Sequence, residues 1–254
     1  MDMQKIPGGN LVIPALILGL CFMGGTVYAA KTAYRMKSLS NNISVTGSAE
    51  RILKSDVAKW SGSFSRTVDT NGLKQGYSDM KKDWETVQGF LKNSGLEEKT
   101  ISQMPITVSQ NTECVSAGPE QPCASTRLSG YTLRQSFGVE STNVDKVTAI
   151  AQQAGAKLAD AGIVLEGSSP EFYYSKLADL KLEMLAEATK SATQRANQII
   201  TNSGAKLGNV VEAGMGVFQI TAVNSTEISD YGSYDTSSID KKVTAIVRAS
   251  YTIK

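Results

Sequence analysis

Hydrophobic positions along this chain change their spacing several times, and each change predicts a different element. Residues 6–30 contain no charged side chain. As a helix, this run of about 25 residues is long enough to cross the roughly 30 Å hydrocarbon core of a bilayer. Residues 43–48 and 58–68 then alternate apolar with polar positions, which predicts two strands.

Three later segments place apolar residues three or four positions apart, which is the spacing of the buried stripe of a helix. They cover residues 73–95, 142–162 and 175–202, and each ends close to a glycine. The stripe of the third helix is rich in small residues, so we expect another element to approach it closely. Its predicted members are Leu177, Leu180, Met184, Ala188, Ala192, Ala196 and Ile199.

The remaining alternating segments are predicted to be strands, at residues 101–110, 131–139, 163–165, 172–174, 216–223 and 243–253. Met104-Pro105 indicates an edge strand or a bulge in the first of them, and residues 224–240 form a polar loop. Strand pairs around separated helices are typical of an α+β fold. We therefore predict antiparallel strand pairs packed with three long helices, preceded by one N-terminal transmembrane helix.

The apolar N-terminal segment fits two interpretations. A signal peptide has a basic start, a short apolar core and small residues before the cut, and residues 5–29 supply these in order. An uncleaved anchor would use the whole run, with Tyr28 and a basic flank at the membrane interface. We favour the anchor, and we divide the chain into an anchor with its flank, residues 1–37, and an α+β domain, residues 38–254.

The side of the membrane depends on how the flanking charges are weighed. Lys31, Arg35 and Lys37 outnumber Lys5, and the positive-inside rule alone would keep the large domain in the cytoplasm. The bias is small, however, and both a signal peptide and a signal anchor export the domain that is joined to them. We therefore predict a single-pass protein of the cytoplasmic membrane, with its large domain on the extracytoplasmic, periplasmic side.

Composition removes several classes of function. The chain has no histidine, which excludes catalysis and metal binding through imidazole. Its 26 basic and 24 acidic residues nearly balance, unlike the strongly basic domains that bind nucleic acid. No carboxylate pair stands in an apolar context that would separate two pKa values. We expect no catalytic residues, no metal, no cofactor and no nucleic-acid partner, and hence a protein that is not an enzyme.

Two of the three cysteines, Cys114 and Cys123, flank a turn-rich loop inside the predicted hairpin. A zinc site usually needs four ligands, and a thioredoxin-like pair has two residues between its cysteines rather than eight. In an exported domain this pair would form a disulfide, whereas in a cytoplasmic domain both thiols would stay free. Export therefore predicts a Cys114–Cys123 disulfide.

Two tyrosines of the polar loop, Tyr231 and Tyr234, form the candidate binding loop, because tyrosine provides rigid contact area at binding surfaces. The alternative is a mobile hairpin tip without a binding role.

Several stretches, taken in order, resemble the SIMPL-domain family of bacterial envelope proteins. They are residues 43–50 (ISVTGSAE), 56–60 (DVAKW), 172–174 (FYY), 182–189 (LEMLAEAT) and 192–208, and the resemblance covers residues 43–254. It implies an α+β domain that can assemble into large homo-oligomeric rings with a channel-like shape. It also implies an envelope role linked to oxidative stress and no catalytic residues. The segment between Cys114 and Cys123 and the 224–240 loop depart from simpler members.

We therefore expect a membrane-anchored protein that self-assembles into a homo-oligomer at the cell envelope. The alternative is a monomeric extracytoplasmic binding module for a peptide, a glycan or a small ligand, which would use the loop of Tyr231 and Tyr234.

Overall fold

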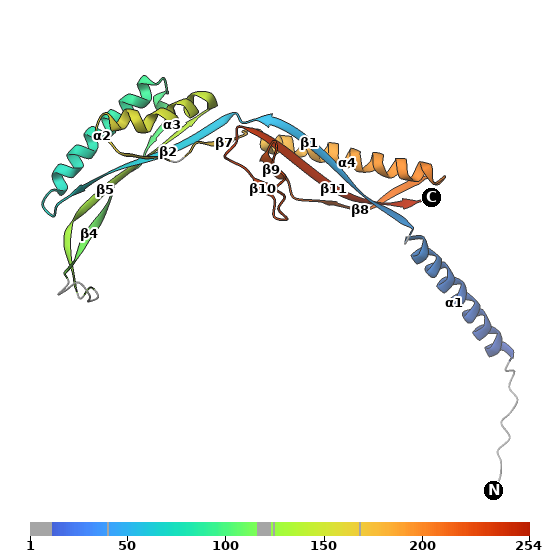
Figure 1. Ribbon diagram of the computed structural model, residues 1–254. Helices are drawn as coiled ribbons and strands as arrows, with labels where there is room; N and C mark the ends of the chain where they lie inside the picture. The colour runs from blue at the N-terminus through green and yellow to red at the C-terminus, as the bar shows by residue number, and fades with distance from the viewer. Residues whose placement is uncertain (1–11, 40, 116–122, 124, 168) are drawn as a thin grey trace, which may run out of the picture. The chain divides into compact units, whose positions relative to one another are not determined.

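The computed structural model describes residues 12–39, 41–115, 123, 125–167 and 169–254. Helix α1 (Val12–Leu39) precedes strands β1 (Asn42–Lys54) and β2 (Val57–Val68), helix α2 (Leu73–Asn93) and a short 3-10 helix (Glu98–Thr100). Strands β3 (Ile101–Gln103), β4 (Thr107–Val115) and β5 (Ser125–Ser141) follow, then α3 (Val144–Ala159), β6 (Leu165–Gly167) and β7 (Glu171–Tyr173). Next come α4 (Leu177–Asn202), β8 (Leu207–Met215), β9 (Gln219–Ala222), β10 (Ser233–Tyr234) and β11 (Asp240–Ile253) (Figure 1). This element order confirms the α+β class and the three long helices that follow the apolar N-terminal one.

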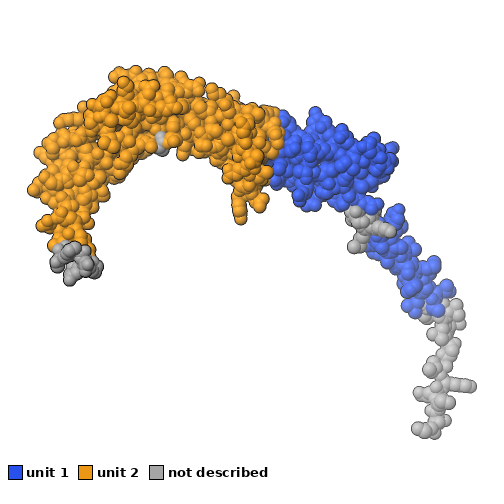
Figure 2. All heavy atoms as spheres, viewed as in Figure 1, with its two compact units in different colours: residues 1–49, 184–216, 245–254 blue, residues 50–183, 217–244 orange. Residues whose placement is uncertain are grey.

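The chain divides into two compact units (Figure 2). Unit 1 comprises Met1–Ala49, Met184–Gly216 and Ala245–Lys254, and unit 2 comprises Glu50–Glu183 and Val217–Thr244. Strands β1 and β11 and helix α4 therefore contribute to both units. The boundary between an anchor at 1–37 and a domain at 38–254 is a different kind of division, and it stays a prediction.

Unit 2 is built on a six-stranded sheet with α2 and α3 packed on one face. The central strands β2 and β5 are antiparallel, with register from Ala58↔Ser141 to Val68↔Tyr131. Strands β3 and β4 pair with β5, while β6 and β7 pair with β2. Because side chains alternate along a strand, Trp60 and Phe137 pack in the core at 5.4 Å between ring centroids. The alternate positions lie on the open face of this sheet and are polar.

Local signals in the sequence explain where several elements begin and end. The side chain of Asn143 accepts a hydrogen bond from the Lys146 N–H at 3.1 Å, and so caps α3. Gly95 has φ +85° and ends α2 in the left-handed conformation that favours glycine. The single strand predicted over residues 101–110 is divided into β3 and β4, because Pro105 has no N–H to donate to a ladder.

In unit 1, the second half of α4 covers one face of β1 and β11. Gly47 of β1 lies so close to the helix that an added Cβ would be 2.2 Å from the Ala188 carbonyl oxygen and 2.3 Å from the Ala192 nitrogen. The buried alanines of α4 therefore do allow a close approach, as their size predicts. The stripe was mispredicted at its end, where Ile199 is 54% exposed and Ile200 is buried instead. The buried residues from Leu180 to Ile200 keep a spacing of four.

Strand β8 was not expected from the sequence. It pairs with β11 in antiparallel register, from Val247↔Met215 to Ile253↔Leu207. Residues 209–215 are all exposed, so no alternation of buried and exposed positions marks the strand. The predicted strand at 216–223 shortens to β9, and the one at 163–165 moves to β6.

Candidate functional site

Part of α1 has the length and composition of a membrane span. Ala15–Tyr34 has 20 residues with a mean hydropathy of 1.4, and none of the span is buried against the rest of the protein. A signal sequence passes the same test, so both interpretations of the N-terminal segment stay open.

The cysteine pair lies at the end of an exposed hairpin. The sulfur atoms of Cys114 and Cys123 are 2.14 Å apart, which is a bonding distance. Strands β4 and β5 remain paired up to Cys114↔Thr126 and Val115↔Ser125, so the bond joins a paired residue of β4 to Cys123, which lies two residues before β5. The intervening residues 116–122 lie outside the described part of the chain.

The two tyrosines of the candidate binding loop have different surroundings. Tyr231 is 98% exposed at a turn. Tyr234 belongs to β10, which pairs in parallel with β9, and its ring centroid lies 6.2 Å from that of Tyr173 on β7. Tyr234 is thus half of an aromatic pair, whereas Tyr231 projects away from the protein.

The segment after Tyr234 is held by Asp235 and Lys241. The Lys241 side chain is only 2% exposed, and its ammonium donates to the carbonyl oxygens of Asp235 at 2.5 Å and Ser238 at 2.8 Å. Burial alone would raise the pKa of the Asp235 carboxyl. Hydrogen bonds from the Ser238 and Ser237 hydroxyls and the Ser237 N–H, together with the Lys241 charge, outweigh it and lower that pKa to about 2. These contacts tie residues 235–238 of the loop to Lys241 at the start of β11.

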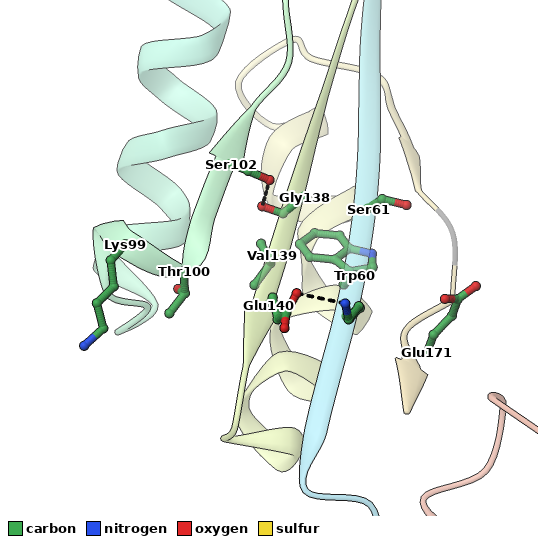
Figure 3. A pocket seen from close by; sticks show the side chains of 10 residues that line it. Trp60, Ser61, Lys99, Thr100, Ser102, Gly138, Val139, Glu140 and Glu171 are labelled. Carbon is green, nitrogen blue, oxygen red and sulfur yellow. Dashed lines mark hydrogen bonds and ion pairs between the residues drawn. The ribbon is translucent and has the colours of Figure 1, made fainter. Parts of the chain in front are cut away.

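A hollow of 770 Å³ opens on the open face of the unit 2 sheet (Figure 3). Ser61 on β2, Gly138 on β5 and Ser102 on β3 are small, and they leave the space that larger side chains would fill. The Ser102 hydroxyl donates to the Gly138 carbonyl oxygen at 3.2 Å. Lys99 lies at one side of the hollow and Glu171 at the other.

The charged residues around this hollow are mutually compensated. Lys59 and Glu140 form an ion pair at 3.0 Å, and Lys99 pairs with Glu97 at 2.6 Å. The hydrogen bond that the Lys99 ammonium donates to the Glu97 carboxylate raises the pKa of Lys99. A lining of hydroxyls and paired charges can bind a neutral polar ligand through hydrogen bonds, but it presents no excess charge to an ion.

Two residues that line the hollow, Lys59 and Glu171, also contact Tyr173 of the aromatic pair. The Tyr173 hydroxyl donates to the Glu171 carboxylate at 2.6 Å, and this bond raises the pKa of Tyr173. The Lys59 ammonium lies 5.5 Å from the Tyr173 ring centroid, within the range of a cation–π contact. Tyr173 thus lies between these two lining residues and Tyr234, which does not itself line the hollow.

The sequence pointed to Tyr234 but not to Tyr173, Lys59 or Glu171. The register of β2 and β7 brings them together, with Val57↔Tyr173 and Lys59↔Glu171 as partners, and a single sequence does not show which strands pair. In the described residues, no group of three or more acidic or cysteine side chains is arranged to hold a metal ion.

These features define an α+β protein with one candidate membrane span at its N-terminal end and a polar hollow on an open sheet face. A family model described as SIMPL, protein of unknown function (DUF541), matches residues 43–251. The chain therefore belongs to the SIMPL family. No curated protein matches it. The matched region runs from β1 to β11 and leaves α1 outside.

Proposed function

We propose that this chain is a non-enzymatic, membrane-anchored SIMPL protein that self-assembles into a homo-oligomer, ring-like or channel-like, at the cell envelope. Its α+β domain lies on the periplasmic side of the cytoplasmic membrane, and its role is linked to oxidative-stress tolerance. The observation that carries the anchor is α1, whose 20-residue apolar span is exposed along its length.

The cysteine pair supports the extracytoplasmic side. Disulfides form and persist in oxidising compartments and are rare in the cytosol. Cys114 and Cys123 are at bonding distance at the end of an exposed hairpin, where they would be reduced if the domain faced the cytoplasm.

Two strand edges support self-assembly. Strands β4 and β8 have nine residues each, and each pairs with a single neighbour among the strands that the structure describes. An unpaired edge presents backbone N–H and C=O groups that can pair with another chain. On β8, Val211 and Met215 also expose apolar surface. A membrane tether raises the local concentration, so that weak contacts suffice for assembly.

Light scattering on the full chain in detergent micelles tests assembly. We expect a protein mass several times that of the 27.1 kDa monomer. Val211→Lys should lower the mass to that of a monomer, because a charge on an edge strand opposes edge pairing. Val164→Lys, at an exposed valine of unit 2, is the matched control and should leave assembly intact. A wild-type monomer at the highest attainable concentration would refute self-assembly.

The hollow beside Tyr173 and Tyr234 favours a second candidate, a monomeric binding module for a peptide, a glycan or a small ligand. Its compensated charges suit a neutral polar ligand better than an ion. Calorimetry with neutral oligosaccharides and short uncharged peptides would test this candidate. Tyr234→Ala should weaken binding without changing the mass from light scattering, whereas Val211→Lys should leave binding unchanged.

A further inference from the structure

The two units carry opposite net charges. Unit 1 contains nine lysines and arginines but only three aspartates and glutamates, a formal net charge of +6, of which +3 belongs to residues 1–37 and +3 to the rest of the unit. The other 17 basic and 21 acidic residues belong to unit 2, whose net charge is −4. The positive charge of unit 1 favours its contact with a negatively charged partner.

Unit 1 is also the unit that contains the membrane span. The span ends at Tyr34, α1 continues to Leu39, and β1 begins at Asn42. Five helical residues rise about 7.5 Å, and the two residues before Asn42 reach at most about 7 Å. The start of β1 therefore lies within about 15 Å of the hydrocarbon core, of which the headgroup layer itself takes up several ångströms. At physiological salt the Debye length is about 8 Å, so this end of unit 1 is within electrostatic reach of the headgroups.

Two lysines lie at this end of the sheet. The Ile253 N–H donates to the Asn41 carbonyl oxygen at 3.0 Å, which places the end of β11 beside the start of β1. Lys206 and Lys254 exchange both backbone hydrogen bonds, at 2.7 and 2.8 Å, and are therefore directly opposite each other. Both are exposed, and neither forms an ion pair with any residue that the structure describes.

Like charges directly opposite each other on paired strands repel and destabilise the sheet locally. An anionic surface facing both ammonium groups would remove that repulsion. Ile199 near the end of α4 and Ile253 beside Lys254 are also exposed, so apolar side chains accompany the two charges. Basic and apolar side chains together are typical of a surface that contacts a lipid interface.

We propose that the end of unit 1 formed by Lys206, Lys254 and the start of β1 docks on anionic phospholipid headgroups beside its own membrane span. The inference rests on the proposed membrane anchor and adds a second contact with the bilayer. Docking limits the angles that the domain can adopt above the membrane, because the anchor and the headgroup contact act together.

The rate at which lysines react with a neutral acylating reagent tests docking directly. The full chain is placed in nanodiscs of phosphatidylcholine, or of phosphatidylcholine with about a third phosphatidylglycerol, and each lysine is followed by mass spectrometry. Attraction to an anionic surface favours the lipid-bound state of each lysine about five-fold. Because a lysine in contact with headgroups is shielded from the reagent, Lys206 and Lys254 should each react about five-fold more slowly in the anionic discs. Lys74 and Lys81 of α2, both exposed, are internal controls and should react equally in both discs.

Charge-reversal variants separate docking from other causes of protection. Lys206→Glu should restore the reactivity of Lys254 in anionic discs, and Lys74→Glu should leave Lys254 protected. About 1 M salt should also remove the protection, because the Debye length falls to about 3 Å.

The outcomes distinguish this inference from the anchor on which it rests. A chain that does not enter the discs would overturn the anchor. A chain that enters them but shows equal reactivity of Lys206 and Lys254 in both lipids would overturn docking and leave the anchor standing. Slow reaction of both lysines in pure phosphatidylcholine as well would also overturn docking on anionic headgroups, because the protection would then not depend on headgroup charge.

Discussion

The contact between β1 and α4 predicts that Gly47→Ala destabilises the protein severely. In an ordinary strand this substitution would be favourable by about 0.5–1 kcal/mol, because glycine loses more conformational freedom on folding. Here the new methyl group would lie 2.2 Å from the Ala188 oxygen, 2.3 Å from the Ala192 nitrogen and 2.8 Å from the Ala192 Cα. All three are backbone atoms of a helix, so no side-chain rotation can relieve the clash and the strand and helix must separate.

Overpacking of a core typically costs about 1–3 kcal/mol, and a clash with backbone belongs at the upper end. We therefore expect a loss of about 3 kcal/mol, which for a chain of this size lowers Tm by roughly 6–12 °C. Circular dichroism during heating of the full chain in detergent measures it. Gly214→Ala is the matched control, since it is also in a strand of unit 1 and an added Cβ there meets nothing within 4 Å. A Gly47→Ala variant as stable as the wild type would refute the close packing of β1 on α4.

Three further substitutions have defined consequences. Arg66→Ala removes the guanidinium that donates to the Asp83 carboxylate at 2.8 Å, and this carboxylate is only 10% exposed. Urea unfolding should show that the free energy of unfolding falls by about 1–3 kcal/mol. The double variant Arg66→Ala/Asp83→Asn should lose less stability than Arg66→Ala, because it leaves no buried charge unpaired. The pKa of Asp235 falls from 3.8 to about 2 on folding, so its contribution of about 2 kcal/mol is complete above pH 4 and is lost as the pH falls toward 2. Asp235→Asn should therefore be less stable than the wild type at pH 7, and the difference should fall to about 0.4 kcal/mol at pH 2, where the wild-type carboxyl is half ionised. Cys114→Ser should cost about 2.5–3 kcal/mol for a loop of about ten residues, and reductant should lower the wild type to the level of the variant but not affect Cys114→Ser further.

Elements with a buried face were predictable because burial imposes a period. The stripe of α2 and the alternation of β2 both arise from packing against one core, and the proline at position 105 divides β3 from β4 for a local covalent reason. Strand β8 has no buried face, so nothing in its own residues distinguishes it from a loop. It forms because β11 offers it a partner, which is information outside the segment.

The candidate site shows the same limit at the level of side chains. Tyr234 could be singled out as an aromatic residue in a polar loop, but its partner Tyr173 comes from β7, about sixty residues earlier in the sequence. The register between β2 and β7 decides that Lys59 and Glu171 meet at the hollow. Likewise, the position of Lys206 opposite Lys254 depends on how β8 pairs with β11.

The mass of the native chain, with alkylation before and after reduction, tests the proposed anchor and its orientation most directly. Cells are treated with a thiol reagent at lysis, and the purified chain is weighed and then treated again with reductant present. We predict an intact N-terminal segment, with Cys114 and Cys123 alkylated only after reduction. Free labelling of both cysteines at lysis would place the domain in the cytoplasm, as the count of flanking lysines and arginines suggests, and a chain that begins after residue 29 would show that no anchor remains.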